Sequence, residues 1–400
     1  MPSSDIERLT TPLLQSDEKL IRADHLSELW AGYGHIYRLH LKQASGSQRT
    51  TRILKTIDPP SQANKGKRKD EGHLRKMFSY QIEANFYRAY AARFLTSPGA
   101  KKHGCGVPKL FAASERDDKT QVLLLQDLTQ DYPVLTERRA TLSEQQVDKA
   151  IEWLATFHAT FWNVESPKTG LAAQGTGCPP PLLAQDWNGE GLWQQGGYSY
   201  LATRMDELRS VDSRDGEWGS AGLHEASELP FAVDWCLNNP HDRRRLSLIH
   251  GDVKAANMAF SEDSTRMAMY DFQYVGKGLG VQDLAKFLTT SIGSRYLKQE
   301  NGEVKLLRRY HSILCEQLPQ AVATAYPFQD LMQDWELALV SWVRFLAGWS
   351  GGFWGNVDWL TTRVSNLLHD PDWTAQVIAR WRNGDPDAEF RTSLLQDTDR

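Results

Sequence analysis

The chain has 400 residues, of which 40% are hydrophobic and 24% are charged, and these proportions are ordinary for a globular protein with an ample core. This length is enough for two domains or for one two-lobed unit. The formal net charge of −4 argues against a nucleic-acid binder, which would normally carry a basic surface.

The first twenty residues, "MPSSDIERLTTPLLQSDEKL", lack the charged-then-apolar pattern of a secretory signal. No window approaches the roughly 18 uninterrupted apolar residues of a membrane span. The four cysteines lie far apart and include no C-x-x-C pair, which argues against a disulfide framework or a cysteine metal site. We therefore expect a cytoplasmic protein that binds neither membranes nor nucleic acid.

Two strands are predicted at Gly34 to Lys42 and at Thr51 to Ile57, where apolar and β-branched residues alternate or cluster. The polar residues between them indicate a hairpin turn. Lys55 lies on the second strand, from which a lysine can reach the α- and β-phosphates of a nucleotide. Gly32 and Gly34, at the start of the first strand, would allow the backbone to approach phosphates closely.

A long helix is predicted at His73 to Leu95, because its apolar residues recur at helical spacing. It carries Glu83, which could hold Lys55 in an ion pair. Further strands are predicted at Val107 to Ala113 and at Gln121 to Leu128. The first part of the chain is thus β-rich with one prominent helix.

The last of these strands runs into a linker, where the backbone of Gln126 and Leu128 could form hydrogen bonds with an adenine edge. We expect residues 1–127 to form an N-terminal nucleotide-binding lobe. Beyond this point the pattern becomes mainly helical, and residues 128–400 are expected to form a C-terminal catalytic and acceptor-binding lobe.

The stretch "LSLIHGDVKAANMAF" places several polar side chains in one tight loop between two short apolar segments. Such a loop suits phosphoryl transfer to a hydroxyl: Asp252 can accept the hydroxyl proton, and the oxygen of Asn257 can hold Mg²⁺. Asp271, after the next short apolar strand, supplies a second metal ligand. Lys254 could neutralise charge on the transferring phosphate.

Each of these residues alone has an ordinary structural explanation. A strand lysine such as Lys55 is usually a surface residue, a helix glutamate such as Glu83 is usually solvated, and Gly32 with Gly34 could form a simple turn. Asp271 could cap a turn or form an ion pair. The order of the whole set along the chain favours the catalytic interpretation.

The segments "HGDVKAAN" and "YDFQYVGKGLGVQDLAKFL" resemble those of the kinase-like phosphotransferases of small molecules. This superfamily includes aminoglycoside phosphotransferases and choline kinases, and the sequence is most similar to its ecdysteroid-kinase-like (CHK kinase-like) branch. The resemblance covers roughly Trp30 to Leu288. It implies an α+β, bilobal, protein-kinase-like fold with a small β-rich N-lobe and a larger, mainly helical C-lobe.

The resemblance also implies a role for each motif residue. Asp252 would be the catalytic base, Asn257 and Asp271 would hold magnesium, and Lys55 with Glu83 would anchor the nucleotide phosphates. A glycine follows His250 where protein kinases have an arginine, and no A-P-E segment is present. Both differences favour a small-molecule acceptor over a protein substrate.

Two further polar residues allow more than one explanation. Asp283 precedes a helical pattern and could be its N-cap, while the resemblance suggests that it braces the catalytic loop through backbone N–H groups. His158 lies on an apolar helix face, where a packed histidine is the commoner case than a catalytic one.

Seven of the 14 tryptophans fall between Trp335 and Trp381. Trp335, Trp342 and Trp349 form a stripe at helical spacing, which core packing would explain, but Trp342 to Trp359 could instead line an acceptor pocket. Residues 1–127 hold 21 Lys and Arg against 14 Asp and Glu, so the rest of the chain, from totals of 46 and 50, holds 25 against 36. An acidic second lobe would favour a cationic acceptor such as an amino alcohol, held in an aromatic cage.

The sequence therefore predicts an ATP- and Mg²⁺-dependent kinase that phosphorylates a hydroxyl of a small molecule, such as an amino alcohol, an aminosugar or a sterol-like alcohol. The alternative is a nucleotide-binding pseudokinase that serves as an interaction module. The presence of the base, both metal ligands and the anchoring lysine argues against this alternative.

Overall fold

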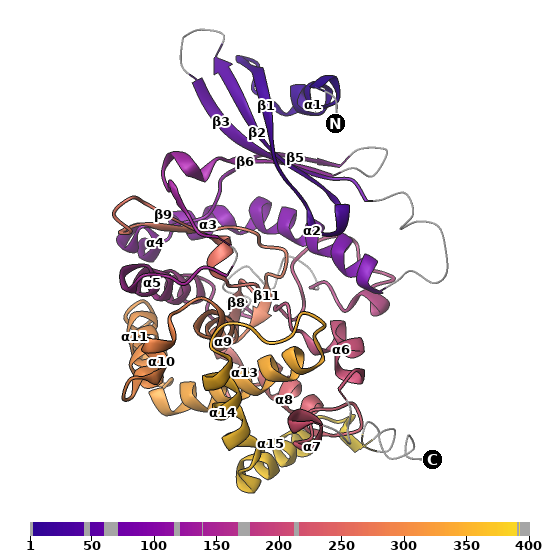
Figure 1. Ribbon diagram of the computed structural model, residues 1–400, viewed down its shortest axis with the longest axis vertical. Helices are drawn as coiled ribbons and strands as arrows, with labels where there is room; N and C mark the ends of the chain where they lie inside the picture. The colour runs from indigo at the N-terminus through magenta and orange to yellow at the C-terminus, as the bar shows by residue number, and fades with distance from the viewer. Residues whose placement is uncertain are drawn as a thin grey trace.

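The computed structural model describes residues 3–43, 49–59, 71–115, 121–137, 139–166, 177–211, 216–389 and 392. A β-sheet stands at one end of the molecule, and helices make up most of the remainder (Figure 1). Within these ranges no helix is long and apolar enough to cross a membrane.

The N-terminal sheet has five strands in the order β1-β2-β3-β6-β5, and every neighbouring pair is antiparallel. Its strands are β1 (Glu18–Glu28), β2 (Gly34–Gln43), β3 (Arg49–Ile57), β5 (Leu110–Glu115) and β6 (Gln121–Gln126). The four strands predicted from the sequence are confirmed, whereas β1 was not predicted. The turn expected between β2 and β3 falls mostly on residues 44–48, which lie outside the described ranges.

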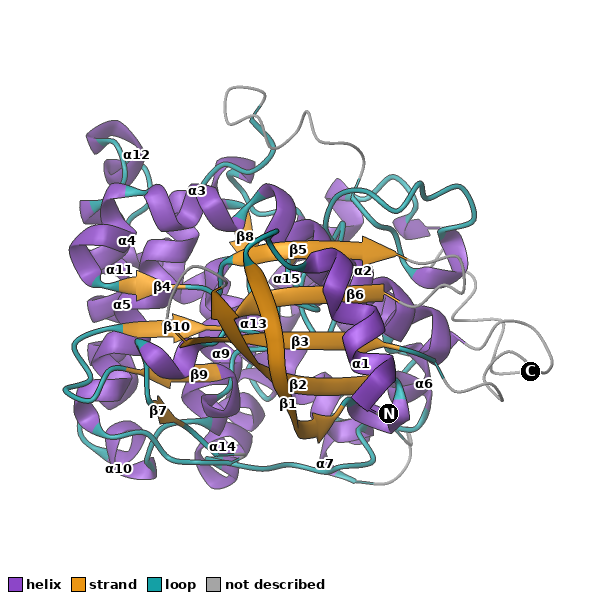
Figure 2. Ribbon diagram, turned by 90° about the horizontal axis from the view of Figure 1, so that it is seen from above, coloured by secondary structure: helices purple, strands orange, loops and turns teal. Residues whose placement is uncertain are grey.

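The two faces of this sheet are buried by different partners, as the alternation of side chains along a strand requires. On one face Leu39, Leu41 and Leu54 pack with α1 (Ser3–Thr10), which lies across the sheet in Figure 2. On the other face Lys55 stands directly opposite Leu123 of β6. Lys55 therefore points toward the interior between the sheet and the next helix.

That helix is α2 (Glu71–Ala89), which runs beneath the sheet (Figure 1). The sequence predicted one helix to Leu95, but the chain ends α2 early and starts α3 (Ala91–Thr96) after a break at Tyr90. The apolar spacing continues across the break, so periodicity alone does not reveal it. Glu83 lies in the buried stretch of α2.

The C-terminal part is mainly helical, with short strands that carry the catalytic segments. The strands outside the N-terminal sheet are β4 (Cys105–Gly106), β7 (Val134–Leu135), β8 (Ser247–Ile249), β9 (Met258–Phe260), β10 (Met267–Met269) and β11 (Gly276–Gly278). The helices that follow α3 are α4 (Pro98–His103), α5 (Glu144–Thr160), α6 (Met205–Arg209), α7 (Glu217–Ser220), α8 (Leu229–Asn238), α9 (Gly280–Thr290), α10 (Ser294–Lys298), α11 (Gly302–Glu316), α12 (Gln320–Thr324), α13 (Phe328–Gly348), α14 (Val357–Leu368) and α15 (Pro371–Gly384).

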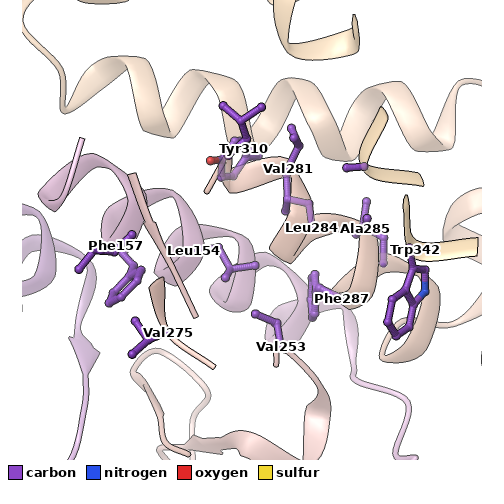
Figure 3. Packing of buried hydrophobic residues seen from close by; sticks show 14 of the residues in the cluster. Leu154, Phe157, Val253, Val275, Val281, Leu284, Ala285, Phe287, Tyr310 and Trp342 are labelled. Atoms are coloured by element: carbon purple, nitrogen blue, oxygen red, sulfur yellow. The ribbon is translucent and has the colours of Figure 1, made fainter. Parts of the chain in front are cut away.

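The centre of this part is α9, which is buried along almost its whole length. It packs against α5 and α13, and Figure 3 shows Tyr310 near its Val281 end and Trp342 near its Phe287 end. Because α9 is buried although it carries Asp283, Lys286 and two threonines, these polar side chains need hydrogen-bond partners inside the protein. The molecule thus has the predicted α+β fold, with a small β-rich lobe followed by a larger helical one.

Candidate active site

The loop that holds Asp252 begins where β8 ends at Ile249. Gly251 has φ +81°, and a Cβ atom there would lie 2.2 Å from the carbonyl oxygen of Tyr274, so only glycine fits. The His250 ring accepts from the Asp252 N–H at Nδ1 (3.2 Å) and donates from Nε2 to the Tyr270 carbonyl (3.0 Å). Burial lowers the pKa of His250, which keeps this ring neutral and the loop fixed.

Asp283 braces the same loop, as the resemblance implied. Its carboxylate accepts the backbone N–H groups of His250 (2.7 Å) and Gly251 (2.8 Å). It also lies 3.1 Å from Nε2 of His158, whose Nδ1 is 2.8 Å from the hydroxyl of Tyr310. The N-cap explanation for Asp283 is wrong, because Leu279 caps α9 and Asp283 lies inside the helix.

His158 is fully buried, as expected of a packed histidine, and it also takes part in this chain of hydrogen bonds. The chain is satisfied when Nε2 carries the ring proton, so that it donates to Asp283 while the Tyr310 hydroxyl donates to Nδ1. The brace therefore reaches from α11 through α5 and α9 to the catalytic loop.

The carboxylate of Asp252 is buried and contacts two lysines. Lys254 Nζ lies 2.6 Å from Oδ2, and Lys286 Nζ contacts Oδ1. The Asn257 amide donates to the Asp252 carbonyl (2.9 Å) and lies 3.4 Å from Oδ2. Burial alone would raise the pKa of Asp252, but Lys254 and Lys286 outweigh it and hold the pKa well below its usual range.

Lys286 was not predicted as a site residue. The signal was nevertheless present, because a lysine interrupts the apolar run "DLAKFL" three residues after Asp283. A charged residue inside a buried helix needs a specific partner, and here that partner is Asp252.

Asn257 and Asp271 are brought together by pairing between the segments that carry them, since the Tyr270 N–H donates to the Asn257 carbonyl at 3.1 Å. Asp271 has φ +70°. Its Oδ1 is buried and, among the described residues, has no hydrogen-bond partner; it lies 3.6 Å from Lys55 Nζ. A buried carboxylate oxygen that accepts no hydrogen bond is the kind of ligand that a hard cation such as Mg²⁺ takes, and the Asn257 side chain, whose nitrogen donates to Asp252, has its amide oxygen available as a second one.

The described residues contain no group of three His, Cys, Asp or Glu that could hold a metal on their own. Mg²⁺ in nucleotide sites is usually held by one or two protein oxygens together with phosphates and water. The pair Asn257 and Asp271 is consistent with that kind of site.

Lys55 and Glu83 form the predicted ion pair, with Nζ 2.6 Å from Oε2 and both side chains buried. Burial raises the pKa of Glu83 to about 7, against the opposing effect of Lys55. Burial lowers the pKa of Lys55, but Glu83 and Asp271 raise it by more, so the net shift is upward.

Of the two predicted glycines, Gly32 lies in the connection between β1 and β2, and Gly34 is the first residue of β2. Gly32 has φ +71° with open space around its Cα, which suits a close approach by a ligand. At Gly34 a Cβ atom would lie 1.9 Å from the Thr56 carbonyl oxygen, so this glycine is needed for packing against β3 next to Lys55.

The predicted adenine-binding linker follows β6. The Gln126 N–H donates to the Lys109 carbonyl (2.9 Å), and the Leu128 carbonyl accepts from Asp131 and Tyr132. These bonds occupy the N–H of Gln126 and the carbonyl of Leu128.

A small pocket opens beside the catalytic loop. It is lined by Gly251, by Lys286 of α9, by Trp342 of α13 and by the segment Gly197–Ser199. The Tyr198 N–H donates to the Gly251 carbonyl (2.8 Å), which ties this segment to the loop. No signal in the Gly- and Trp-rich sequence pointed to Tyr198.

The tryptophans from 335 onward divide between two roles. Trp335 is core, with its Nε1 bonded to Glu303 (2.6 Å). Trp342 lines the pocket, and Trp354 meets it edge to face (centroids 5.6 Å apart) while lining a separate depression. A Cβ atom on Gly355 would lie 2.0 Å from the Thr289 carbonyl oxygen, so this glycine lets the loop after α13 pack on α9.

Comparison with known proteins gives one family. The model described as "Ecdysteroid kinase-like family" matches residues 33–321. A search of curated protein sequences finds no match.

Several solved structures are similar over most of the chain. An amicoumacin kinase in complex with AMP-PNP, Ca²⁺ and Ami shares 11% identity, with TM-score 0.45, over 92% of this chain and 94% of that chain. The Plasmodium vivax ethanolamine kinase shares 10% identity, with TM-score 0.44, over 90% and 84%. A microcompartment-associated aminopropanol kinase shares 13% identity, with TM-score 0.40, over 96% and 98%.

Proposed function

The chain belongs to the ecdysteroid kinase-like family, and on this basis we propose that it is an ATP- and Mg²⁺-dependent kinase that phosphorylates a hydroxyl of a small molecule. The observation that supports this most is the convergence of Lys254, Lys286 and Asn257 on one buried carboxylate, Asp252. We further propose that residues 1–127 bind the nucleotide and that residues 128–400 supply catalysis and the acceptor site.

In the proposed reaction the acceptor oxygen forms a bond to the γ-phosphorus while the bond to the β,γ-bridging oxygen breaks. ADP leaves, and the hydroxyl proton passes to Asp252. A carboxylate with a depressed pKa is a weak base, so Asp252 first orients the hydroxyl and takes the proton late, when the new O–P bond has made the hydroxyl acidic. Lys254, which contacts Asp252, would offset the negative charge on the phosphoryl group during its transfer.

Asn257 and Asp271 would hold the magnesium ion, which when bound neutralises phosphate charge. Lys55, fixed by Glu83, would hold the α- and β-phosphates beneath Gly32 and Gly34. The backbone of Gln126 and Leu128 would hold the adenine edge.

A pseudokinase of this fold would be expected to lack one of the catalytic groups or to hold it out of place. The described residues retain the base, two candidate metal ligands and the lysine–glutamate pair in contact, which weighs against an interaction module without activity.

The test is ATP consumption by the purified protein against a panel of alcohols, amino alcohols, aminosugars and sterols, with Mg²⁺ present. The proposal predicts ADP release that depends on one class of acceptor, together with a phosphorylated product. MgATP binding without transfer to any hydroxyl compound would favour the interaction module instead.

A further inference from the structure

The catalytic carboxylate has more cationic partners than it can neutralise. Lys254 occupies Oδ2 of Asp252 and Lys286 contacts Oδ1, so two ammonium groups share one negative charge. Lys254 is also attracted to the carboxylate of Asp271 and lies in the field of Tyr198, whereas Lys286 itself lines the pocket.

Lys286 is enclosed on the pocket side by aromatic rings. Its Nζ lies 4.7 Å from the ring centroid of Tyr198 and 5.4 Å from that of Trp342. Its side chain is only 8% exposed. The protein's own ammonium group therefore fills the aromatic space in which a cationic head group would otherwise bind.

Two buried guanidinium groups lie behind the segment Gly197–Ser199, which lines the pocket. Arg204 donates to the Tyr198 carbonyl (2.7 Å) and lies over its ring, and Arg344 donates to the Ser199 carbonyl (2.5 Å). Each is 2% exposed, and each has one nitrogen without a hydrogen-bond partner among the described residues, Nη2 of Arg204 and Nη1 of Arg344.

Burial lowers the pKa of Arg204, but Tyr274, Tyr198 and the carboxylates of Glu207 and Glu71 raise it by more, so the two arginines differ in how well they are compensated. Glu207 pairs with Arg204 at 3.3 Å, and Asp234 and Glu207 act on Arg344 only through longer-range attraction. Burial lowers the pKa of Arg344 to about 10, as expected for a guanidinium that lacks a close counter-charge. The charged residues that line the pocket itself are Lys286 and Asp283, and the Asp283 carboxylate already accepts the backbone N–H groups of His250 and Gly251. The two guanidinium groups lie behind this lining, although the helical lobe as a whole is acidic.

Acceptor binding must disturb this arrangement. A hydroxyl that is to give its proton to Asp252 has to take the place of one of the two lysines on the carboxylate. If it displaces Lys286, a buried ammonium group loses its counter-charge, which is strongly unfavourable unless the acceptor supplies another.

We propose that the acceptor is a hydroxy compound that also carries an oxyanion, a carboxylate or a phosphate, and that Lys286 binds this oxyanion between Tyr198 and Trp342. The inference rests on the proposed kinase function and specifies the substrate class of the same site. It reverses the preference for an amino alcohol drawn from the charge of the whole lobe, because exposed charges are screened by solvent and buried ones are not.

The first arm of the test uses wild-type protein and sets of hydroxy compounds that share a skeleton and differ in charge. One set is glycerate, glycerol 3-phosphate, glycerol and 2-amino-1,3-propanediol. A second set is gluconate, glucose 6-phosphate, glucose and glucosamine. The third set compares two anionic sterols, a hydroxylated bile acid and a sterol sulfate that keeps one free hydroxyl, with a neutral sterol. ADP release and product mass are measured, and the carboxylate and phosphate members distinguish the two oxyanions.

The inference predicts that an anionic member is the best acceptor of its set. It is overturned if no anionic member is phosphorylated, or if neutral or cationic members are preferred. Preferential transfer to a neutral or cationic member would contradict this inference alone, whereas absence of both MgATP binding and transfer would contradict the proposed kinase function.

The second arm uses Lys286→Met, which keeps the length of the side chain and removes its charge. We expect KM for the anionic acceptor to rise about tenfold or more, as loss of a charge-assisted hydrogen bond implies, with a smaller fall in kcat and unchanged MgATP affinity. Lys286→Arg should restore most of the acceptor affinity, and Lys305→Met, at an exposed position of α11, is the control. An unchanged KM and an unchanged charge preference in a folded Lys286→Met protein would overturn the assignment. If that variant does not fold, the Lys286→Arg variant and the wild-type panel test the same assignment.

Discussion

Individual residues in this site differ in which physical effect controls their charge. At Asp252 the attraction of Lys254 and Lys286 outweighs burial, so the carboxylate stays ionised. At Glu83 burial outweighs the attraction of Lys55, and its pKa rises to about 7. Under the proposed mechanism, Asp252, which would orient the acceptor, is therefore insensitive to pH near neutrality, while Glu83, which would anchor the phosphate-binding lysine, is sensitive.

MgATP affinity should consequently depend on Glu83. As the pH falls through about 7, Glu83 takes up a proton and Lys55 loses its ion-pair partner, so binding should weaken between about pH 8 and pH 6. Calorimetry on wild type and Glu83→Gln measures this, with Glu300→Gln at an exposed position as the control. The titration of ATP itself affects all three proteins equally, so the steeper slope of wild type reports Glu83.

In Glu83→Gln we expect weaker binding at every pH and a shallower slope. Identical slopes in wild type and Glu83→Gln would show that this carboxyl does not titrate in the range concerned.

Among the secondary-structure elements, α9 connects the core to the chemistry. Asp283 on one of its turns holds the backbone of the loop at His250 and Gly251, and Lys286 one turn later contacts Asp252, the proposed base. Gly280 lets the helix start close to its neighbours, since a Cβ atom there would lie 2.2 Å from the hydroxyl of Tyr310 and 2.5 Å from Nδ1 of His158.

The hydrogen-bond chain behind Asp283 should contribute measurably to stability. Tyr310→Phe removes the donor to His158 and leaves a buried ring nitrogen unpaired, which should lower the free energy of unfolding by about 1–3 kcal/mol. Tyr37→Phe is the matched control, because the Tyr37 hydroxyl is buried and has no hydrogen-bond partner in the described part of the chain. That change should stay within about 0.5 kcal/mol of wild type or stabilise the protein.

Urea unfolding of both variants gives the comparison. Equal effects of Tyr310→Phe and Tyr37→Phe would mean that the bond to His158 adds nothing to the brace.

At the scale of the whole molecule, how much the sequence reveals depends on burial. Strands β2, β3 and β6 contain buried residues, and the edge strand β5 has apolar residues that are partly buried against the core, so these strands show the expected apolar pattern. Strand β1 was missed because it lies at the sheet edge with no buried residue along Glu18–Glu28, so charged and apolar residues follow each other without regular alternation. Lys55 and Glu83, which the sequence motif predicts to pair, form an ion pair in the structure. The motif could predict this contact because both residues belong to one set of groups that phosphoryl transfer requires.

The acceptor side was far less predictable. Tyr198 reaches the pocket, and Arg204 and Arg344 reach the segment that lines it, only through the three-dimensional packing of a Gly- and Trp-rich segment against α13. Their local sequence has no motif, and the charge of the whole lobe favours a cationic acceptor, the opposite of the one proposed above. Long-range packing of buried charges is not encoded in a short pattern.

The site as proposed lies between the two lobes, so nucleotide and metal should stabilise the molecule together. MgATP should raise Tm in wild type, and EDTA should remove that rise, because a ligand that binds only the folded state shifts unfolding by mass action. Asp271→Ala should show no Mg²⁺-dependent rise, while Asp17→Ala, at an exposed position, should behave like wild type. A full Mg²⁺-dependent rise in Asp271→Ala would remove Asp271 from the metal site.

The most direct measurement is turnover of Asp252→Asn with the best acceptor from the panel, next to MgATP affinity of the same protein and with Asp17→Asn as the control. The asparagine cannot take the hydroxyl proton, so turnover should fall by several orders of magnitude while MgATP affinity stays nearly unchanged. Turnover within about tenfold of wild type would contradict the central claim that Asp252 is the base of a small-molecule kinase.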